Sequence, residues 1–284
     1  MVVQVKKLSP AAYRPLLRAA LREDLGTGGD VTTRFFVPAG ARFKARVVSR
    51  EAGVISGLDV AAAAFRACDR GARVRALVRD GARVRPGQAV LELSGGRGLL
   101  TAERTALNFL QRMSGVATLT RRYADLVRGT RARILDTRKT LPGWRALDKY
   151  AVVCGGGVNH RMGLYDAAMV KDNHYLGKRL VEGARELRRA RPSVPLIVEC
   201  DTPAQATRAL ALKPDVILLD NMSPAVLRKE IPRLRRLAPR VKLEISGGVN
   251  LQSLRALARL GPDRISVGRL THSAPALDLG LDLA

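Results

Sequence analysis

The amino-acid sequence predicts an α/β protein in which a small α+β domain precedes a larger domain built on a parallel sheet. In the second half, short apolar runs end in charged residues or glycines, and most are followed by a helix start. Runs this short suit buried strands, and their alternation with helices is typical of a parallel sheet covered by helices. Residues 1–110 lack this rhythm, so we place the two domains at 1–110 and 111–284. The six apolar runs are 134–135, 167–170, 196–198, 216–219, 243–245 and 265–267.

The first domain is predicted to open with a helix. Ser9 and Pro10 form a helix-start pair, and apolar residues follow at helical spacing. A glycine-rich loop then ends the helix. Beyond it, period-2 alternation predicts strands around a short helix, in the order strand 43–49, helix 60–65, strand 73–78 and a strand, Pro-Gly turn and strand within 80–95.

A long helix, or a helix pair, is predicted over residues 101–127. On it Arg104, Asn108 and Gln111 share one face, at positions i, i+4 and i+7. Such a row suits a helix turned towards a polar ligand, whereas Arg104 taken alone would be an ordinary solvated charge. The glycines at 95–98 resemble a phosphate loop, but no Lys-Ser or Lys-Thr follows them, so a surface turn is favoured.

Helix starts in the second domain carry their own signals. Thr202 and Ser223 each place a hydroxyl before a proline at the first helical position, and Asn250 can cap the segment after it. Residues 145–154 are predicted to form a helix that three following glycines stop. A dinucleotide-binding loop is not expected there, because the preceding segment is helical and His160 stands where the third glycine should be.

The composition indicates a globular protein with anionic partners. Hydrophobic residues make up 46% of the 284, which is ample for a packed core, and the formal net charge is +25. Much of the arginine is scattered through predicted helices, which favours solvated faces. A nucleic-acid-binding protein remains an alternative. It should show a basic stripe with interleaved aromatics, whereas aromatic residues are only 4% of this chain.

The cysteines and the N-terminus predict a cytoplasmic protein. Cys68, Cys154 and Cys200 are odd in number and far apart, which argues against a disulfide framework and a zinc site and favours buried free thiols. The N-terminus has no apolar signal-peptide core, and no run approaches membrane-spanning length, so no membrane partner is expected.

Residues closing the six apolar runs predict the functional site. Early runs end in cations, middle runs in carboxylates and late runs in glycines. In a (β/α) barrel, ligands bind at the carboxyl ends of the strands, and a phosphate often binds at the last two. Glycines bring backbone N–H groups close to a phosphate, so the candidate phosphate-binding residues are Ser246, Gly247, Gly248, Val267 and Gly268; plain tight turns are the alternative.

The charged candidates suit a polyanionic substrate. Arginines pair with planar carboxylates in bidentate fashion, and lysines act as point charges for phosphates or carboxylates. The two acids could hold Mg²⁺, bind sugar hydroxyls or stabilise a developing cation, or simply be solvated. His160 is expected to face a ligand, while His174 stays open between a ligand and a structural role. No arrangement predicts a covalent nucleophile. The candidates are Arg104, Arg138, Lys139, His160, Arg161, Lys171, Glu199 and Asp220.

These segments resemble a known family almost end to end. The most specific match is to the core of the quinolinate phosphoribosyltransferases, also called carboxylating nicotinate-nucleotide pyrophosphorylases: DTRKTLPGWRALDKYAVVCGGGVNHR followed by GLYDAAMVKDNH. Further segments resemble the family in the right order: EDLGTGGDVTT, GVISGLDVAAAAF, ERTALNFLQRMSGVATLT, VILLDNMSP, LEISGGVN and ISVGRLTHSAPALDLGLDL.

The resemblance implies a fold and a reaction. The fold would be an incomplete (β/α) barrel of the type II phosphoribosyltransferase kind, and a packing of the final segment back onto the N-terminal domain is left open. The enzyme would be a pentosyltransferase joining quinolinate to phosphoribosyl pyrophosphate with Mg²⁺, giving nicotinate mononucleotide, pyrophosphate and CO₂ in NAD biosynthesis. It would be a homodimer, or a higher assembly of dimers, in which the N-terminal domain completes the neighbouring subunit's site.

Residue roles follow from the same resemblance. The quinolinate carboxylates would be held by Arg138, His160, Arg161 and Lys171, with Arg104 from the neighbouring subunit. Lys139, Glu199 and Asp220 would act on pyrophosphate, ribose and Mg²⁺, the two acids as direct or indirect metal ligands. Three positions depart from the family pattern: Trp144, Cys200 and Arg269. Arg269 adds a cation beside the expected phosphate loop. A molybdenum-transport-associated relative with another aromatic substrate is the alternative enzyme.

Overall fold

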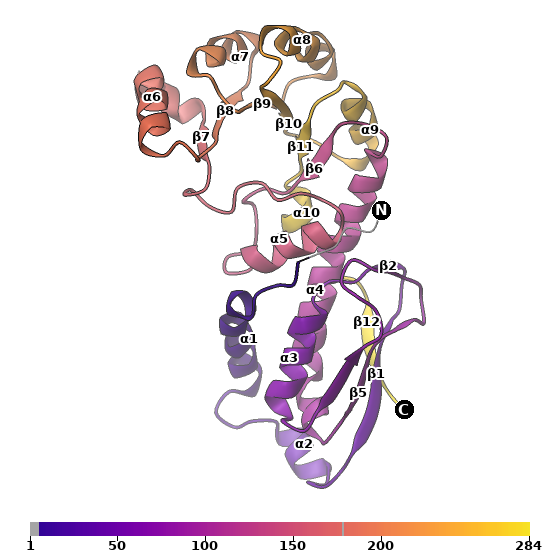
Figure 1. The fold of residues 1–284 in the computed structure, drawn as a ribbon. Coiled ribbons are helices and arrows are strands. Elements are labelled where there is room, and N and C mark those ends of the chain that lie inside the picture. Colours follow the sequence, from indigo (N-terminus) through magenta and orange to yellow (C-terminus); the bar gives the residue numbers. More distant parts are fainter. Residues whose placement is uncertain (1–5, 178) are drawn as a thin grey trace. The chain divides into compact units, whose positions relative to one another are not determined.

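A computed structural model describes residues 6–177 and 179–284, which form two compact units (Figure 1). The first unit holds the residues up to Arg121 together with Thr140–Gly156 and Arg269–Ala284. The second unit holds Arg122–Lys139 and Gly157–Gly268. The boundary near residue 110 stays a prediction, because the first unit also draws on two later segments of the chain.

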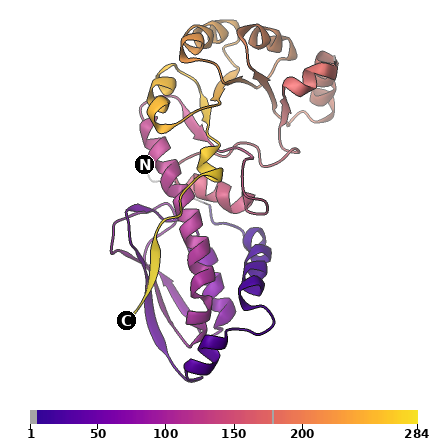
Figure 2. The same ribbon diagram turned by 180° about the vertical axis from the view of Figure 1, so that it is seen from behind.

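The first unit is α+β. Its antiparallel sheet has the order β12-β1-β5-β3, and β2 pairs with β4. Figure 2 shows the C-terminal strand β12 beside β1. The elements are α1 (Pro10–Leu25), α2 (Val31–Phe36), β1 (Phe43–Ser49), β2 (Gly53–Val54), α3 (Leu58–Cys68), β3 (Arg73–Ala76), β4 (Arg83–Val84), β5 (Ala89–Gly95), α4 (Gly98–Leu126), α5 (Arg145–Cys154), α10 (Arg269–His272) and β12 (Leu279–Leu283).

Local signals in the first unit mostly gave the right elements. The helix α1 begins at Pro10 as predicted, but the Ser9 side chain makes no capping hydrogen bond, so the proline alone marks the start. The segment 101–127 is one helix, not a pair. At the turn before it, the N–H of Gly96 donates to the Asp69 carboxylate at 2.5 Å. A carboxylate of the chain itself therefore occupies the place where a phosphate loop would hold its ligand.

The second unit confirms the predicted parallel sheet. All six apolar runs form strands, in the order β6-β11-β10-β9-β8-β7, and helices α6 to α9 lie along the outer side of the arc that they form (Figure 1). The elements are β6 (Arg133–Leu135), β7 (Ala168–Val170), the 3₁₀ helix η1 (Asp172–Gly177), α6 (Leu180–Ala190), β8 (Leu196–Cys200), α7 (Pro203–Ala209), η2 (Leu210–Leu212), β9 (Val216–Asp220), α8 (Pro224–Leu237), β10 (Lys242–Ser246), α9 (Leu251–Arg259) and β11 (Arg264–Ser266).

The predicted helix caps of the second unit are confirmed. Thr202 accepts the N–H of Gln205 at 3.2 Å in a capping box, and Ser223 accepts that of Val226 at 3.4 Å. Asn250 accepts two N–H groups, each at 3.0 Å. These caps satisfy N–H groups that a helix start leaves without partners, so α7, α8 and α9 each begin just after a strand end.

The inner face of this sheet carries both apolar and charged side chains. Ile197, Val216 and Leu218 form an apolar cluster with Ala167. Register places Glu244 beside Leu218 on the same face, and the next strand contributes Arg264 opposite Glu244. No helix of the described residues has both the length and the apolar character to cross a bilayer.

Candidate active site

The carboxyl ends of the six parallel strands lie along one edge of the sheet, since every pairing in it is parallel. Most of the residues predicted from the sequence end or closely follow a strand there, so the structure brings them to one edge as expected. They are Arg138 and Lys139 after β6, Lys171 after β7, Glu199 in β8, Asp220 in β9, Ser246 with Gly247 and Gly248 at the end of β10, and Val267 with Gly268 after β11.

Lys171 and Glu199 form an ion pair between neighbouring strand ends. The ammonium group donates to the Glu199 carboxylate, and the lysine side chain is 39% exposed. His174 folds back onto the same strand end, where its Nδ1 accepts the N–H of Lys171 at 3.0 Å and its own N–H donates to the Lys171 carbonyl at 2.9 Å. His174 thus shapes the loop that presents the lysine.

The loops after β9 and β10 are built against each other. Asn221 has a left-handed backbone, with φ of 51°, and its side-chain amide donates to Asp220 at 2.6 Å. Its own N–H donates to the Ser246 carbonyl at 3.0 Å. Gly247 has φ of 88°, and a Cβ there would collide with the Asn221 side chain. Only glycine therefore fits at 247, and this tight loop leads into the N-terminus of α9, an arrangement that favours anions.

Val267 takes part in the hydrogen bonding of the six-stranded sheet. Its N–H donates to the Leu135 carbonyl at 2.9 Å, and its side chain is buried. A phosphate could use this N–H only if that bond broke.

His160 is held inside the second unit by buried acids. Its backbone N–H donates to the fully buried Asp136 at 2.8 Å. One ring nitrogen, Nδ1, accepts the N–H of Arg161 at 2.7 Å, and the other, Nε2, lies 3.3 Å from a carboxylate oxygen of Glu244. The side chain is only 6% exposed. A ligand-facing role for His160 stays a prediction, since the contact between Nε2 and Glu244 falls short of hydrogen-bond geometry.

The Arg161 guanidinium lies in a field of mixed charges. It donates to the Ala167 carbonyl at 3.0 Å. Its pKa is lowered, first by partial burial and then by the positive charge of Arg138, while Asp166 and Glu199 oppose the shift. Two cations that repel each other across a partly desolvated space are suited to a dicarboxylate, which would relieve the repulsion.

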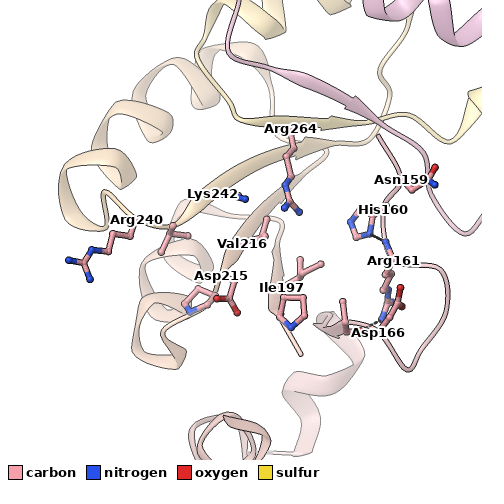
Figure 3. Close-up of a pocket in the computed structure, with 14 residues that line it drawn as sticks. Asn159, His160, Arg161, Asp166, Ile197, Asp215, Val216, Arg240, Lys242 and Arg264 are labelled. Atoms are coloured by element: carbon pink, nitrogen blue, oxygen red, sulfur yellow. Dashed lines mark hydrogen bonds between the residues drawn. The ribbon is translucent and has the colours of Figure 1, made fainter. Parts of the chain in front are cut away.

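A cavity of about 560 Å³ opens on the inner face of the sheet (Figure 3). It reaches the amino ends of the strands, the edge opposite the predicted site, and His160 and Arg161 line it. Its two acids are engaged by backbone, since Asp166 accepts the N–H of Met162 and Asp215 accepts that of Leu196, both at 2.7 Å. The other charged residues lining it are cations: Arg240, Lys242 and Arg264.

Arg104 is not among the residues that the second unit brings together. It is exposed on α4, in the first unit, as is Asn108. The third member of the predicted row, Gln111, donates to the Leu279 carbonyl at 2.7 Å. The expectation that the whole row faces a ligand is therefore wrong for Gln111, which holds the start of β12.

Sequence reasoning missed the buried acids behind the site. Glu244 is fully buried, accepts the Ser266 hydroxyl and lies 3.9 Å from Arg264. The signal was a single carboxylate inside the apolar run that became β10, which a buried strand does not carry without a partner. Asp136 directly follows the apolar run 134–135, but its side chain was not among the predicted site residues. Among the described residues, no cluster of three or more His, Cys, Asp or Glu side chains is arranged to hold a metal ion.

Comparisons with known proteins agree over the whole chain. Two family models match: "Quinolinate phosphoribosyl transferase, N-terminal domain" over residues 30–114 and "Quinolinate phosphoribosyl transferase, C-terminal domain" over residues 116–282. The chain is 49% identical to a carboxylating nicotinate-nucleotide pyrophosphorylase of Mycobacterium leprae, covering 96% of this chain and 97% of the relative. A probable carboxylating nicotinate-nucleotide pyrophosphorylase of Bacillus subtilis is 37% identical, with 95% and 93% covered. The solved nicotinate-nucleotide pyrophosphorylase of Francisella tularensis superposes with a TM-score of 0.91 at 35% identity, with 100% of both chains covered.

Proposed function

The chain belongs to the quinolinate phosphoribosyltransferase family, and we propose that it performs the family's reaction at the carboxyl edge of the six-stranded sheet. It is a pentosyltransferase that joins quinolinate to phosphoribosyl pyrophosphate and forms nicotinate mononucleotide, pyrophosphate and CO₂ for NAD biosynthesis. The observation that carries this is the 49% identity over 96% of the chain. The alternatives of a different aromatic substrate or of nucleic-acid binding are not favoured.

The quinolinate end of the site is proposed to be its cationic end. Arg138 and Arg161 would each pair with a carboxylate, and Lys171 would exchange part of its contact with Glu199 for the substrate. His160 belongs to this end because its ring nitrogen Nδ1 accepts the backbone N–H of Arg161. The repulsion between the two arginines supports a dianion as the ligand.

The phosphoribosyl end is proposed to comprise the carboxylates and the glycine loops. Glu199 and Asp220 close neighbouring strands, and Lys139 would meet the pyrophosphate. The 5′-phosphate would bind at Ser246, Gly247, Gly248 and Gly268 and, if its N–H is released, at Val267. Mg²⁺ commonly binds through one or two carboxylates plus substrate phosphates, which suits this sparse donor set, and it would offset charge on the departing pyrophosphate.

The chemistry proposed for these side chains is electrostatic. As the bond between the ribose carbon and pyrophosphate breaks, the sugar becomes oxocarbenium-like, and Glu199 with Asp220 favours that positive charge while Lys139 favours the leaving group. The pyridine nitrogen then bonds to the ribose carbon and becomes cationic. The cation stabilises the electron pair left on the ring when the adjacent carboxylate departs as CO₂, and that carbon then takes up a proton from solvent. Decarboxylation therefore follows transfer, and CO₂ release from quinolinate without phosphoribosyl pyrophosphate would contradict this order.

We propose a homodimer in which Arg104 completes the quinolinate site of the second copy. The support is that Arg104 is exposed on α4 and lies outside the unit that gathers the other cations. A cytoplasmic location is proposed because the thiols of Cys68, Cys154 and Cys200 are free and the latter two are buried.

A direct assay tests the function. Quinolinate, phosphoribosyl pyrophosphate and Mg²⁺ are mixed with the protein, and nicotinate mononucleotide and CO₂ are measured. We expect one of each per quinolinate consumed. Turnover of another aromatic acid or base with no turnover of quinolinate would instead assign the alternative substrate.

Two variants test the cationic end. Arg138→Ala and Lys171→Ala should raise the quinolinate KM or abolish turnover, each losing about 2–5 kcal/mol of charge pairing while the fold persists. Arg228→Ala and Lys229→Ala, exposed on the outer helix α8, are the matched controls and should leave the kinetics unchanged. Near-normal kinetics in both site variants would remove these residues from the site.

A further inference from the structure

Glu244 is a charged group in a place where an apolar one would fit. Its side chain is fully buried on the inner face of β10, and its register partner on β9 is Leu218. Burying a carboxylate is unfavourable unless it is hydrogen-bonded, and well-packed apolar replacements are often no less stable. Ser266 donates to it and Arg264 faces its second oxygen at 3.9 Å. The arrangement calls for a role that Leu or Ile could not perform.

The geometry favours one tautomer of the neighbouring histidine. Nδ1 of His160 accepts the backbone N–H of Arg161 at 2.7 Å, so that nitrogen carries no hydrogen. The ring proton must then be on Nε2, which lies 3.3 Å from Oε1 of Glu244. A histidine's tautomer is set by what its two nitrogens contact. The Nε2–Oε1 contact falls short of hydrogen-bond geometry, so the Glu244 carboxylate favours the proton on Nε2 through its charge at this distance, while the Arg161 N–H favours a bare Nδ1.

We infer that Glu244 is a positioning residue for quinolinate binding, which acts through the Nε2–H tautomer of His160 to hold the backbone of Arg161. Asp136 fixes the histidine from the other side, by accepting its backbone N–H at 2.8 Å. The backbone N–H groups of His160 and Arg161 are thereby both held by hydrogen bonds, so the direction in which the Arg161 side chain extends from the backbone is restricted. The substrate class concerned is a planar dicarboxylate, and this part of the inference rests on the proposed function.

The tautomer is measured directly by nitrogen NMR on ¹⁵N-histidine-labelled protein at the assay pH. The chain has only three histidines, and His174→Gln and His272→Gln assign the resonances. We expect His160 to show an unprotonated Nδ1 and a protonated Nε2. In Glu244→Ala this single-tautomer signature should be lost, and in Glu244→Gln, whose amide oxygen still presents a partial negative charge to Nε2, it should be largely kept. An imidazolium or an Nδ1–H tautomer in the wild type would overturn the inference.

Kinetics supply the second readout. Glu244→Ala should raise the quinolinate KM by about 10- to 100-fold, the effect of losing a hydrogen bond in a charged network, with a much smaller change in the KM of phosphoribosyl pyrophosphate. Glu244→Gln should recover most of this loss. The matched control is Glu230→Ala on the outer helix α8, where a buried carboxylate binds Arg233 at 2.7 Å. It should reduce stability and leave both KM values unchanged.

Other outcomes are equally decisive. If Glu244→Ala does not fold, Ser266→Ala, which removes only the hydroxyl that orients the carboxylate, carries the same two readouts. A quinolinate KM unchanged in a folded Glu244→Ala or Ser266→Ala variant would reduce Glu244 to a purely structural residue. If the wild type fails to turn over quinolinate at all, the proposed function fails, while the NMR result still decides the arrangement of His160.

Discussion

At the scale of single residues, Asp80 shows how a buried carboxylate organises the first unit. It accepts the N–H groups of Gly57 at 3.1 Å and Leu58 at 3.2 Å, and so satisfies the start of α3, where a glycine stands at the cap position. The Tyr150 hydroxyl donates to it at 2.7 Å. Burial raises the pKa of Asp80 and outweighs these hydrogen bonds, which lower it. Burial likewise raises the pKa of Tyr150, with the nearby Asp80 charge adding to the shift.

Asp80→Asn should therefore change the pH dependence of stability. A raised pKa means that the folded state binds the proton more tightly than the unfolded state. The contribution of Asp80 to the free energy of unfolding is thus fully present below its ordinary pKa of 3.8 and is lost as pH rises through the raised value. The asparagine side chain does not ionise, so the variant does not lose free energy of unfolding in this way as pH rises. Urea unfolding at pH 3 and pH 7 should show Asp80→Asn gaining stability relative to wild type as pH rises, and a pH-independent difference would contradict it.

At the scale of elements, helix α4 depends on one missing side chain. Gly115 lies within the helix, where alanine is ordinarily the better residue by about 1 kcal/mol. A Cβ at this position would collide with the backbone of Pro275 and Ala276, which pass close to the helix in the first unit. The close approach of two backbones requires glycine there, and helix propensity is overridden.

Gly115→Ala should therefore destabilise the protein by about 1–3 kcal/mol, the usual cost of forcing extra volume into a packed site. Gly183→Ala on α6 is the matched control. Gly183 is also helical, with open space where its Cβ would be, so alanine should stabilise by about 0.5–1 kcal/mol. Thermal unfolding of both variants gives the comparison, and shifts of equal sign would refute the packing argument.

The elements themselves were largely predictable, because their signals are local. Each strand of the parallel sheet is a short apolar run with a polar end, and the caps at Thr202, Ser223 and Asn250 lie next to the helices that they start. The helix α2 was missed within a glycine-rich stretch, although Asp30 caps it by accepting the N–H of Thr33 at 2.8 Å. A six-residue helix offers too few residues for a periodic pattern to be recognised.

At the scale of the whole molecule, the candidate site was predictable only in part. Parallel strands share one carboxyl edge, so reading the strand ends was enough to gather Lys171, Glu199 and Asp220. The contact between His160 and Glu244 was not predictable, because it depends on the order and register of strands distant in the sequence. Local patterns give side-chain type and spacing, whereas partners across a sheet follow from topology.

Chain topology also makes the extreme C-terminus part of the N-terminal sheet. Five residues of β12 pair with β1, from Ser49 opposite Leu279 to Ala45 opposite Leu283, and β12 is the edge strand that covers β1. The matched C-terminal family model extends to residue 282, so a cut between the two family models would remove β12 from the sheet it completes. The first unit should accordingly be unable to fold fully without the end of the chain.

Deleting residues 279–284 should lower the Tm and promote association, because β1 would become an unprotected edge with unpaired N–H and carbonyl groups. Thermal unfolding and light scattering measure the two effects. Asp282→Asn is the control: it removes the partly exposed ion pair with Arg50, worth no more than about 1 kcal/mol, and keeps the strand. It should remain unassociated and lose little Tm. If the deletion and the control change the Tm and the association equally, the backbone pairing of β12 adds no stability beyond that of the Arg50–Asp282 ion pair, and the prediction is wrong.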